Sequence, residues 1–312
     1  MHSSGDGRVV TVVGPTATGK SDLAVDVALR LTASNKIPVE IINADSMQLY
    51  RGMDIGTAKM AVAERRGVPH HLLDIWALDK SAAVAEYQAL ARAAIADIRS
   101  RGAVPLLVGG SGLYVRAAVD RLEFPGESPE IRARLNQELA DVGPAEMHRQ
   151  LAAVDPDAAA AILPSNGRRI VRALEVHELT GGPFLARMPG FDALYDTVQI
   201  GLDRTDLDER VDHRVQQMVE RGLVAEVVRL CADGLRTSPT AGKALGYAQV
   251  LDVVDDAGVV HGDLDEAVAI TQRATRRFVR RQRSWFRRDP RITWLDGAAG
   301  DRVEQALTLI TG

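Results

Sequence analysis

The sequence has only one cysteine, Cys231, among its 312 residues. A single cysteine excludes an intramolecular disulfide framework and a multi-cysteine zinc site. Long hydrophobic runs are also missing, because no apolar stretch approaches the roughly 18 residues that suggest a membrane helix. The polar residues 1–8 lead directly into the first hydrophobic segment and leave no room for a signal peptide. We therefore expect a cytoplasmic protein that has no membrane-spanning segment.

Acidic residues are scarce in one short stretch near the C-terminus, although the whole chain carries a net charge of −4. Many of the arginines there are spaced three and four residues apart, which places them on one broad stripe of a helix. Because arginine suits phosphate recognition, we expect this stripe to contact phosphates; a solvated helix face is the alternative. With Asp289 as the only acid among them, the arginines are Arg273, Arg276, Arg277, Arg280, Arg281, Arg283, Arg287, Arg288 and Arg291.

The best-defined motif lies between residues 14 and 21 and fits the pattern G-x-x-x-x-G-K-[ST] of a phosphate-binding loop. A β-branched run at 9–13 is typical of a buried strand, and apolar residues recur at helical spacing after the loop. Backbone amides can surround phosphate oxygens here, Lys20 supplies a positive charge, and the Ser21 hydroxyl can bind Mg²⁺. The loop consists of Gly14, Pro15, Thr16, Ala17, Thr18, Gly19, Lys20 and Ser21.

The loop predicts a di- or triphosphate ligand and leaves the fate of that ligand open. The ligand could donate a phosphoryl group, be hydrolysed, or carry a different group on its diphosphate. Residues outside the loop must decide between these possibilities.

Strand-like and helix-like segments alternate up to about residue 119, which indicates an α/β fold with a P-loop NTPase-like parallel sheet. We expect further strands at 39–42 and 104–108 and a helix at 82–99. The carboxyl ends of parallel strands share one edge of the sheet. Asp45 and Ser111 follow two of these strands, so they should lie on the same edge as the phosphate loop.

An inserted all-helical domain is predicted at residues 121–197, so that the core consists of residues 1–120 and 198–312. A strand-like segment at 198–202 marks the return to the sheet. Three arginines are spaced to share a face of the last inserted helix and form a second basic patch: Arg168, Arg169 and Arg172. Helix starts are indicated at Ser128, Asp155 and Ser165.

Seven short motifs together resemble one family, the tRNA dimethylallyltransferases, also called tRNA isopentenyltransferases. The resemblance runs from the first strand to about residue 295, and the order and number of the motifs make it specific. It departs mildly from the family at Thr18 and Ser111, which both keep a hydroxyl group. The motifs are the phosphate loop and residues 43–50 (NADSMQLY), 53–59 (MDIGTAK), 67–74 (GVPHHLLD), 109–114 (GGSGLY), 168–175 (RRIVRALE) and 245–247 (LGY).

This resemblance implies transfer of a dimethylallyl group from dimethylallyl diphosphate to N6 of an adenosine beside the anticodon of tRNA. The phosphate loop would hold the diphosphate leaving group together with Lys20 and Mg²⁺. The family's catalytic aspartate falls on Asp45, which we expect to take the proton of the acceptor amine; ordering Mg²⁺ through water is its alternative role. A diphosphate-binding arginine of the family falls on Arg214, which from the sequence alone would be an ordinary exposed helical residue.

The resemblance also implies where tRNA is bound, and it gives both basic patches a use. The inserted domain would bind tRNA, and the protein is expected to act as a monomer. His70 and His71 cannot both face one ion from a regular element, so we expect them to be structural. The implied tRNA contacts are Asp45, Ser46, Met47, Gln48, Ser111, Arg132, Arg168, Arg169, Ile170, Val171 and Arg172.

Three other functions remain open. A small-molecule P-loop kinase would use the same loop with ATP, but it does not explain the arginines. An adenylate isopentenyltransferase would modify a free nucleotide and would need neither basic patch. A noncatalytic RNA-binding module would leave Lys20, Ser21 and Asp45 without a use. Salt dependence separates these functions. Affinity for tRNA should fall steeply with salt, whereas the affinity of a metabolite kinase for its substrate should change little.

Overall fold

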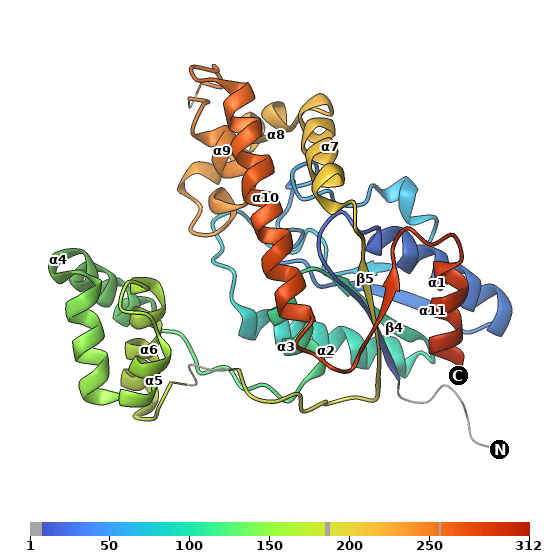
Figure 1. Cartoon of the computed structure of the whole chain (residues 1–312), viewed down its shortest axis with the longest axis horizontal. Coiled ribbons are helices and arrows are strands. Elements are labelled where there is room, and N and C mark those ends of the chain that lie inside the picture. The colour runs from blue at the N-terminus through green and yellow to red at the C-terminus, as the bar shows by residue number, and fades with distance from the viewer. Residues whose placement is uncertain (1–7, 185–187, 256) are drawn as a thin grey trace. The chain divides into compact units, whose positions relative to one another are not determined.

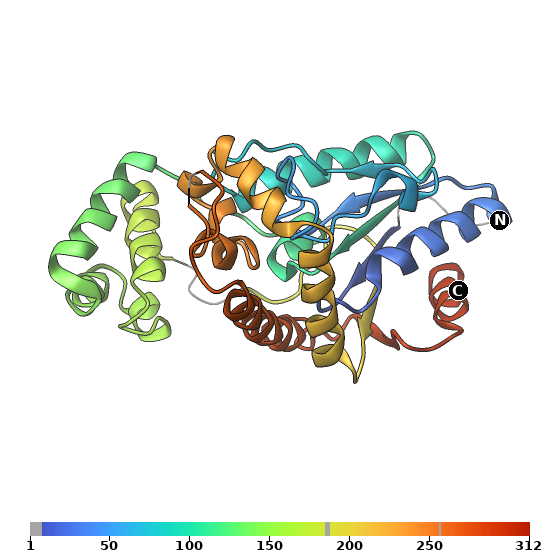
Figure 2. The same cartoon turned by 90° about the horizontal axis from the view of Figure 1, so that it is seen from above.

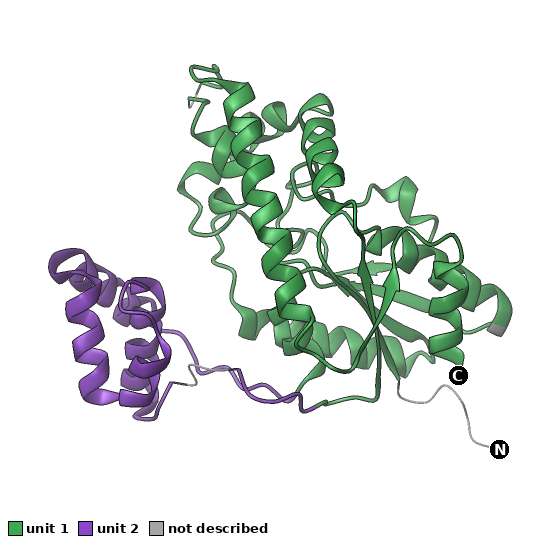
Figure 3. Ribbon diagram, viewed as in Figure 1, with its two compact units in different colours: residues 1–120, 193–312 green, residues 121–192 purple. Residues whose placement is uncertain are grey.

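A six-stranded parallel sheet forms the centre of the larger of two units into which the chain divides (Figure 3). The computed structural model describes residues 8–184, 188–255 and 257–312. Contacts between segments assign residues 1–120 and 193–312 to the larger unit and residues 121–192 to the smaller. No helix in the described residues is long and apolar enough to cross a membrane.

The strand order in the sheet is β3-β2-β4-β1-β5-β6, and all neighbouring strands pair in parallel. The predicted strands are confirmed, and β1 lies between β4 and β5 with all five of its residues buried. Two strands were not predicted, because β3 has only two residues and β6 lies at the edge of the sheet. The strands are β1 (Val9–Val13), β2 (Val39–Asn43), β3 (His70–His71), β4 (Val104–Gly109), β5 (Thr197–Asp203) and β6 (Ile292–Asp296).

Helices cover both faces of this sheet, which explains the continuous apolar run in β1. Val10 and Val12 face a core shared with α1 and α11, whereas Val9 and Val13 face a core shared with α2 and α3. Figures 1 and 2 show these helix pairs on opposite sides of the sheet. Their bounds are α1 (Lys20–Asn35), α2 (Val84–Ser100), α3 (Gly112–Val119) and α11 (Arg302–Thr311).

The remaining helices of the larger unit follow β5 in the sequence. The longest, α10 (Leu264–Phe286), contains most of the arginine-rich stretch and contacts α3, α7 and α9. Its first turn is capped by the Asp263 carboxylate, which accepts a hydrogen bond from the Glu266 amide. The others are α7 (Leu207–Glu220), α8 (Leu223–Ala232), α9 (Tyr247–Leu251) and the 3₁₀ turns η2 (Leu235–Thr237) and η3 (Ala241–Lys243), whereas the 3₁₀ turn η1 (Val62–Arg65) lies between β2 and β3.

The smaller unit is helical, as predicted, and has its own hydrophobic core, which includes Leu135, Met147 and Ile170. Ser128 and Asp155 cap two of its helices as expected. The third predicted cap is wrong by one residue, because the side chain of Asn166, not Ser165, accepts from the Arg169 amide. The helices are α4 (Pro129–Val154, broken at Gly143), α5 (Pro156–Ala161) and α6 (Gly167–Thr180).

The predicted end of the insertion at residue 197 is five residues too late. Ala193 pairs with Asp120 in an antiparallel bridge, and the Leu194 amide donates to the Val119 carbonyl oxygen at 2.8 Å. Thr197 is already the first residue of β5. These backbone bonds attach residues 193–197 to the larger unit, so the smaller unit ends at residue 192.

Candidate active site

The phosphate loop connects β1 to α1, as its sequence predicts. Gly14 has a φ of 136°, and a Cβ atom there would lie 2.3 Å from the Leu202 carbonyl oxygen, so no other residue fits. Gly19 also has a positive φ of 90°, immediately before the helix begins. The Thr18 hydroxyl donates to the Pro15 carbonyl oxygen at 3.0 Å and closes the loop on itself. Glycine geometry and a hydrogen bond within the loop therefore determine its shape.

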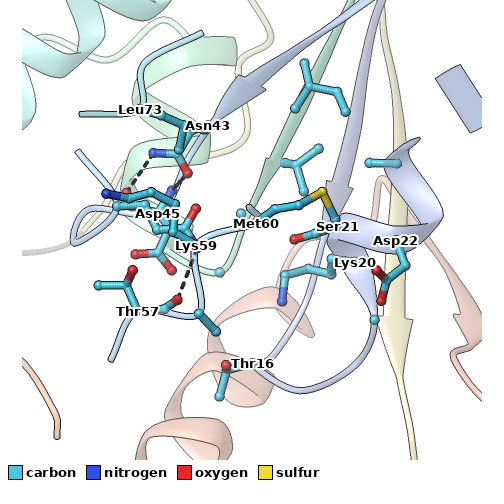
Figure 4. A pocket seen from close by; sticks show the side chains of 18 of the residues that line it. Thr16, Lys20, Ser21, Asp22, Asn43, Asp45, Thr57, Lys59, Met60 and Leu73 are labelled. Carbon is cyan, nitrogen blue, oxygen red and sulfur yellow. Dashed lines mark hydrogen bonds between the residues drawn. The ribbon is translucent and has the colours of Figure 1, made fainter. Parts of the chain in front are cut away.

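A cavity of about 350 Å³ lies beside this loop at the carboxyl edge of the sheet. Lys20 and Ser21 border it from the start of α1, Asp45 from the segment after β2, and Arg214 from α7. Figure 4 shows the side chains of Lys20 and Asp45 entering this space from different elements. The structure thus brings together the three residues that the sequence proposed for catalysis.

Asp45 is held by short-range hydrogen bonds that fix its carboxylate at the edge of the cavity. Its Oδ1 accepts from the Met47 amide at 2.9 Å, and its own amide donates to Asn43 Oδ1 at 2.9 Å. Asn43 also donates through Nδ2 to the Leu72 carbonyl oxygen at 3.0 Å, which anchors this turn to the chain after β3. Asp45 is only half-buried. A carboxylate oriented in this way can accept a proton from a group bound in the cavity.

Lys20 and Arg214 are two of the basic residues that border the cavity. Burial and the nearby charge of Arg214 together lower the pKa of Lys20 to about 7, against the opposing effect of Asp45. Burial also lowers the pKa of Arg214, again against the influence of Asp45. Arg214 borders the cavity, so its interpretation from sequence as an ordinary exposed arginine is wrong. A bound anion would offset the cost of burying these two cations.

The implied tRNA-contacting residues near Asp45 have different positions. Gln48 borders the cavity, and its Nε2 donates to the Thr57 carbonyl oxygen at 3.1 Å. Ser111 Oγ accepts from the Ser46 amide at 3.2 Å, so the segments after β2 and β4 are joined there. Met47 packs partly buried against the hydrophobic core. These contacts confirm that Asp45 and Ser111 lie at one edge of the sheet.

Residues 57–60 form another wall of the cavity, and the contacts that support the segment 53–60 could not be predicted from the sequence. The Lys59 ammonium is 3% exposed and contacts the carboxylates of Asp54 and Asp74 at 2.8 and 2.5 Å. On the same segment, the amides of residues 54–56 all donate to the carboxylate of Glu226 on α8. Glu226 lies about 170 residues away in the sequence, so no local pattern could have indicated this contact.

His70 and His71 have different partners. His71 Nε2 lies 2.6 Å from Glu40 Oε2, whereas His70 Nδ1 lies 2.8 Å from the Val68 carbonyl oxygen. Burial lowers the pKa of His70, and this residue also borders the cavity. Among the described residues, no group of three or more His, Cys, Asp and Glu side chains could hold a metal ion.

A magnesium ion would fit this cavity as a companion of a bound diphosphate. Ser21, Asp22 and Asp45 supply oxygen atoms at its border. Mg²⁺ keeps several waters and commonly binds one or two protein groups together with substrate phosphates. The residues present suit that mode of binding and do not form a complete cage of protein ligands.

In the smaller unit, the predicted RNA-contacting segment is divided between surface and core. Ile170 and Val171 are buried, 0% and 3% exposed, so RNA contact through these two side chains is not possible in this fold. Helix α6 points them inward, whereas Arg168 and Arg169 are exposed. Burial and helical periodicity together explain why a contiguous segment cannot present all its side chains to one partner.

Arg132 and Arg172 of the smaller unit both bind Glu175, a carboxylate with 0% exposure. Arg132 Nη2 lies 2.8 Å and Arg172 Nη1 lies 3.0 Å from Glu175 Oε2. Burial raises the pKa of Glu175, but the Ser128 amide and the two arginines outweigh this effect and lower it overall. Arg132 thus joins α4 to α6, whereas Arg172 shares α6 with Glu175 and also donates to the carbonyl oxygens of Pro125 and Gly126.

The arginine-rich helix is less free than its sequence suggests, because acids from distant segments neutralise part of its charge. Arg276 contacts Asp212 on α7 at 2.5 Å, and Arg283 and Arg287 both contact Asp203 at 2.8 Å. The scarcity of acids in this stretch was therefore a misleading signal. Other arginines of α10 and the residues just after it remain exposed, and several border a second cavity of about 320 Å³: Arg280, Arg281 and Arg288, with Ser284 and Trp285.

Known proteins share both the sequence and the fold. A family model described as IPP transferase matches residues 48–289. A tRNA dimethylallyltransferase of Streptomyces avermitilis is 62% identical over 299 residues, which are 95% of this chain and 93% of the relative. A protein of the same name from Thermobifida fusca is 60% identical over 304 residues, 97% of this chain and 94% of the relative.

Among solved structures, the full-length tRNA isopentenylpyrophosphate transferase of Bacillus halodurans has a TM-score of 0.70 and 39% sequence identity. The match covers 98% of this chain and 96% of that protein. A tRNA isopentenylpyrophosphate transferase of Staphylococcus epidermidis has a TM-score of 0.69 and 32% identity, with 97% and 98% coverage. On sequence and fold alike, this chain belongs to the IPP transferase family.

Proposed function

We propose that this protein transfers a dimethylallyl group from dimethylallyl diphosphate to N6 of an adenosine adjacent to the anticodon of tRNA. The observation that carries the proposal is the position of Asp45 on the same cavity as Lys20, Arg214 and the phosphate loop. In this proposal Asp45 is the base, and Lys20, Arg214 and the loop amides bind the diphosphate. The names of its relatives, tRNA dimethylallyltransferases, support the same reaction.

In this reaction, N6 of the adenine attacks the first carbon of the dimethylallyl group. The N–C bond forms, the C–O bond breaks, and the electron pair of that bond leaves with the diphosphate. N6 is a weak nucleophile because its lone pair is delocalised into the purine ring. Asp45 takes the proton from N6, so that the product amine is neutral.

The developing charge on the diphosphate explains the cationic side of the cavity. As the C–O bond breaks, the leaving oxygen gains negative charge, and the loop amides, Lys20 and Arg214 stabilise it more strongly than they stabilise the substrate. Ser21 would hold Mg²⁺ beside the diphosphate, where the ion would neutralise part of the same charge. These groups are fixed before the reaction, because the loop is closed by the Thr18 hydroxyl and Gly14.

Recognition of tRNA would depend on exposed arginines. Arg168 and Arg169 on α6 are exposed, and so are the arginines that border the second cavity. Phosphate contacts of this kind position an RNA without reading its sequence. The target adenosine must leave its stack before N6 can reach Asp45.

The deciding experiment incubates the protein with Mg²⁺, radiolabelled dimethylallyl diphosphate and unmodified tRNA, followed by nucleoside analysis. We expect the label in N6-dimethylallyladenosine. Transfer to free adenine nucleotides but not to tRNA would instead identify an adenylate isopentenyltransferase. Transfer of the γ-phosphate of ATP to a small acceptor, without prenyl transfer, would identify a kinase.

A further inference from the structure

Gln282 is a buried polar residue near the C-terminal end of the arginine-rich helix α10, and its side chain joins two loops of the cavity. Its Oε1 accepts a hydrogen bond from the Thr16 amide at 3.0 Å, and its Nε2 donates to the Gly110 carbonyl oxygen at 2.9 Å. Gln282 is 6% exposed. Thr16, Gly110 and Gln282 all border the cavity. One side chain therefore spans the gap between the phosphate loop and the segment after β4.

The backbone around Gln282 is shaped to receive it. A Cβ atom on Gly110 would lie 2.4 Å from Gln282 Nε2, so a glycine is required for this approach. One helical turn further along α10, the Trp285 ring lies so close to Gly112 that a Cβ atom there would be 2.1 Å from it. Residues three apart share a helix face, so two successive contacts fix α10 against the glycine-rich segment 109–112.

The turn before Gln282 contacts the phosphate loop itself. Val279, three residues earlier on α10, is 1% exposed and belongs to a small hydrophobic cluster with Ala17 of the loop. Val279 and Gln282 thus secure neighbouring residues of the loop, one through apolar packing and the other through a hydrogen bond. Because the Thr16 amide already donates to Gln282, the conformation of this part of the loop is set before a ligand binds.

We propose that Gln282 is a positioning residue of the diphosphate site, which holds the phosphate loop at a fixed distance from the segment after β4. The inference rests on the proposed function, in which this loop binds the diphosphate of the prenyl donor. Gln282 acts through Thr16 and Gly110 and does not itself take part in bond making. Without this support, the loop would lose conformational entropy when the diphosphate binds, and binding would be weaker.

This role predicts a specific kinetic signature. Without the bridge, binding of the donor and of the transition state should weaken together, so KM for dimethylallyl diphosphate rises and kcat changes little. The loss of one or two buried hydrogen bonds corresponds to a rise of about fivefold to twentyfold. KM for tRNA should stay within about twofold, because the exposed arginines of α10 are unchanged.

The test compares Gln282→Met, which keeps the length of the side chain but removes both polar groups, with the wild-type protein. Gln282→Asn is a second variant, because it keeps both groups on a side chain too short to span the gap. Gln305→Met on α11 is the matched control, since its amide bonds to Asp301 and does not border the cavity. Thermal unfolding of each variant reports whether it is folded.

Calorimetric binding of inorganic diphosphate provides a second measurement that does not require the reaction. Weaker diphosphate binding by both Gln282 variants, with a raised donor KM and an unchanged control, would support the role. A fall in kcat at constant donor KM and constant diphosphate affinity would make Gln282 merely structural. A rise confined to KM for tRNA would overturn the proposal in favour of base contact. Absence of prenyl transfer by the wild-type protein would refute the proposed function, and the diphosphate measurement would still decide the role of Gln282.

Discussion

Asp45 and Lys20 show how the position of a single side chain determines its chemistry. Both border one cavity, and their local bonds differ: Asp45 is oriented by the Met47 amide, whereas Lys20 Nζ donates to the Pro15 carbonyl oxygen at 2.5 Å. The carboxylate can therefore turn a free oxygen lone pair toward an acceptor amine. The ammonium group is held inside the loop that would bind the leaving group.

Replacing Asp45 by asparagine should separate catalysis from folding. The amide oxygen can still accept from the Met47 amide, but the side chain cannot take a proton. We expect kcat for prenyl transfer to fall about 10²- to 10⁴-fold, with tRNA affinity within twofold of wild type. Steady-state kinetics and filter binding measure these two quantities. Asp79→Asn, an exposed aspartate away from the cavity, is the control, and near-normal turnover of Asp45→Asn would remove Asp45 from the mechanism.

Lys20 should make diphosphate binding depend on pH. Its pKa is about 7 in the ligand-free protein, and a bound anion raises it again. Above pH 7 the free side chain is neutral, so binding must take up a proton and weakens by up to about tenfold per pH unit. Lys20→Arg stays charged at every pH and corrects for ionisation of diphosphate itself. Calorimetry between pH 6 and 9 should show the diphosphate affinity of the wild-type protein falling relative to that of Lys20→Arg. A constant ratio of the two affinities would contradict a Lys20 pKa of about 7.

At the scale of elements, α10 combines two kinds of arginine. Arg276 and Arg283 are partly buried and paired with Asp212 and Asp203 of other elements. The pKa of Asp203 is raised by burial but is lowered overall by its bonds to Arg283, Arg287 and the Arg204 amide. Exposed Arg280, Arg281 and Arg288 instead border the second cavity.

Substitutions on α10 and just after it should therefore affect different properties of the protein. Arg281→Ala combined with Arg288→Ala should weaken tRNA binding and lower the salt dependence of log K by about one for each lost phosphate contact. Arg283→Ala should instead destabilise the fold by about 1–3 kcal/mol, because it removes a charge-assisted hydrogen bond from Asp203. Salt titrations of tRNA affinity and denaturant unfolding distinguish them. An unchanged salt slope in the double variant would show that tRNA does not contact this part of the helix.

Helix α8 supports the cavity wall through one buried carboxylate. Glu226 is 6% exposed, receives three consecutive backbone amides from residues 54–56, and accepts from the Tyr247 hydroxyl at 2.5 Å. Gly56 makes this possible, since a Cβ atom there would lie 2.4 Å from the Tyr247 ring. Burial and the Glu226 charge raise the pKa of Tyr247, so its hydroxyl remains a donor at neutral pH.

Glu226→Gln should consequently cost about 1.5–3 kcal/mol of unfolding free energy, since an amide cannot accept from all four donors. Tyr247→Phe removes one bond and should cost about 1 kcal/mol. Urea unfolding measures both values. The control is Glu220→Gln, an exposed glutamate at the end of α7, which should be neutral. Equal stability of Glu226→Gln and Glu220→Gln would argue against a supporting role for Glu226.

At the scale of the whole molecule, the two chain segments that connect the units begin side by side in the larger unit. The chain leaves the larger unit at Asp120 and returns at Ala193, and these residues are bridge partners. The Asp120 carboxylate, which is 0% exposed, is bound by Arg116 and Arg291 at 2.7 Å each. The point of insertion is therefore rigidly held by the larger unit.

Replacing residues 121–192 by a short Gly-Ser linker should leave the larger unit folded. Each unit has its own hydrophobic core, so inorganic diphosphate should bind with unchanged affinity. tRNA affinity should fall at least about tenfold, because the exposed arginines of α6 are removed. Unfolding curves, calorimetry and filter binding test these outcomes. Full tRNA affinity in the shortened protein would exclude a binding role for the helical unit.

Much of this architecture could be predicted from local patterns. The β-branched run at 9–13, the following glycines and the helical spacing after them specify β1, the phosphate loop and α1. The strand β3 could not be predicted, because a segment of two residues is too short to show an alternating hydrophobic pattern. The burial of the Ile170 and Val171 side chains could not be predicted, because a motif does not say which of its side chains face a core.

The sequence by itself determined the α/β core, the place of the phosphate loop, the helical insertion and the family of motifs, because periodicity and glycine geometry act between neighbouring residues. Only the tertiary structure decided which charges are neutralised and which side chains support the cavity. Gln282 and Gly110 are 172 residues apart, and Glu226 and Ile55 are 171 apart. Such pairs depend on how separate elements pack, and packing is decided by the burial of whole faces, which no single segment encodes.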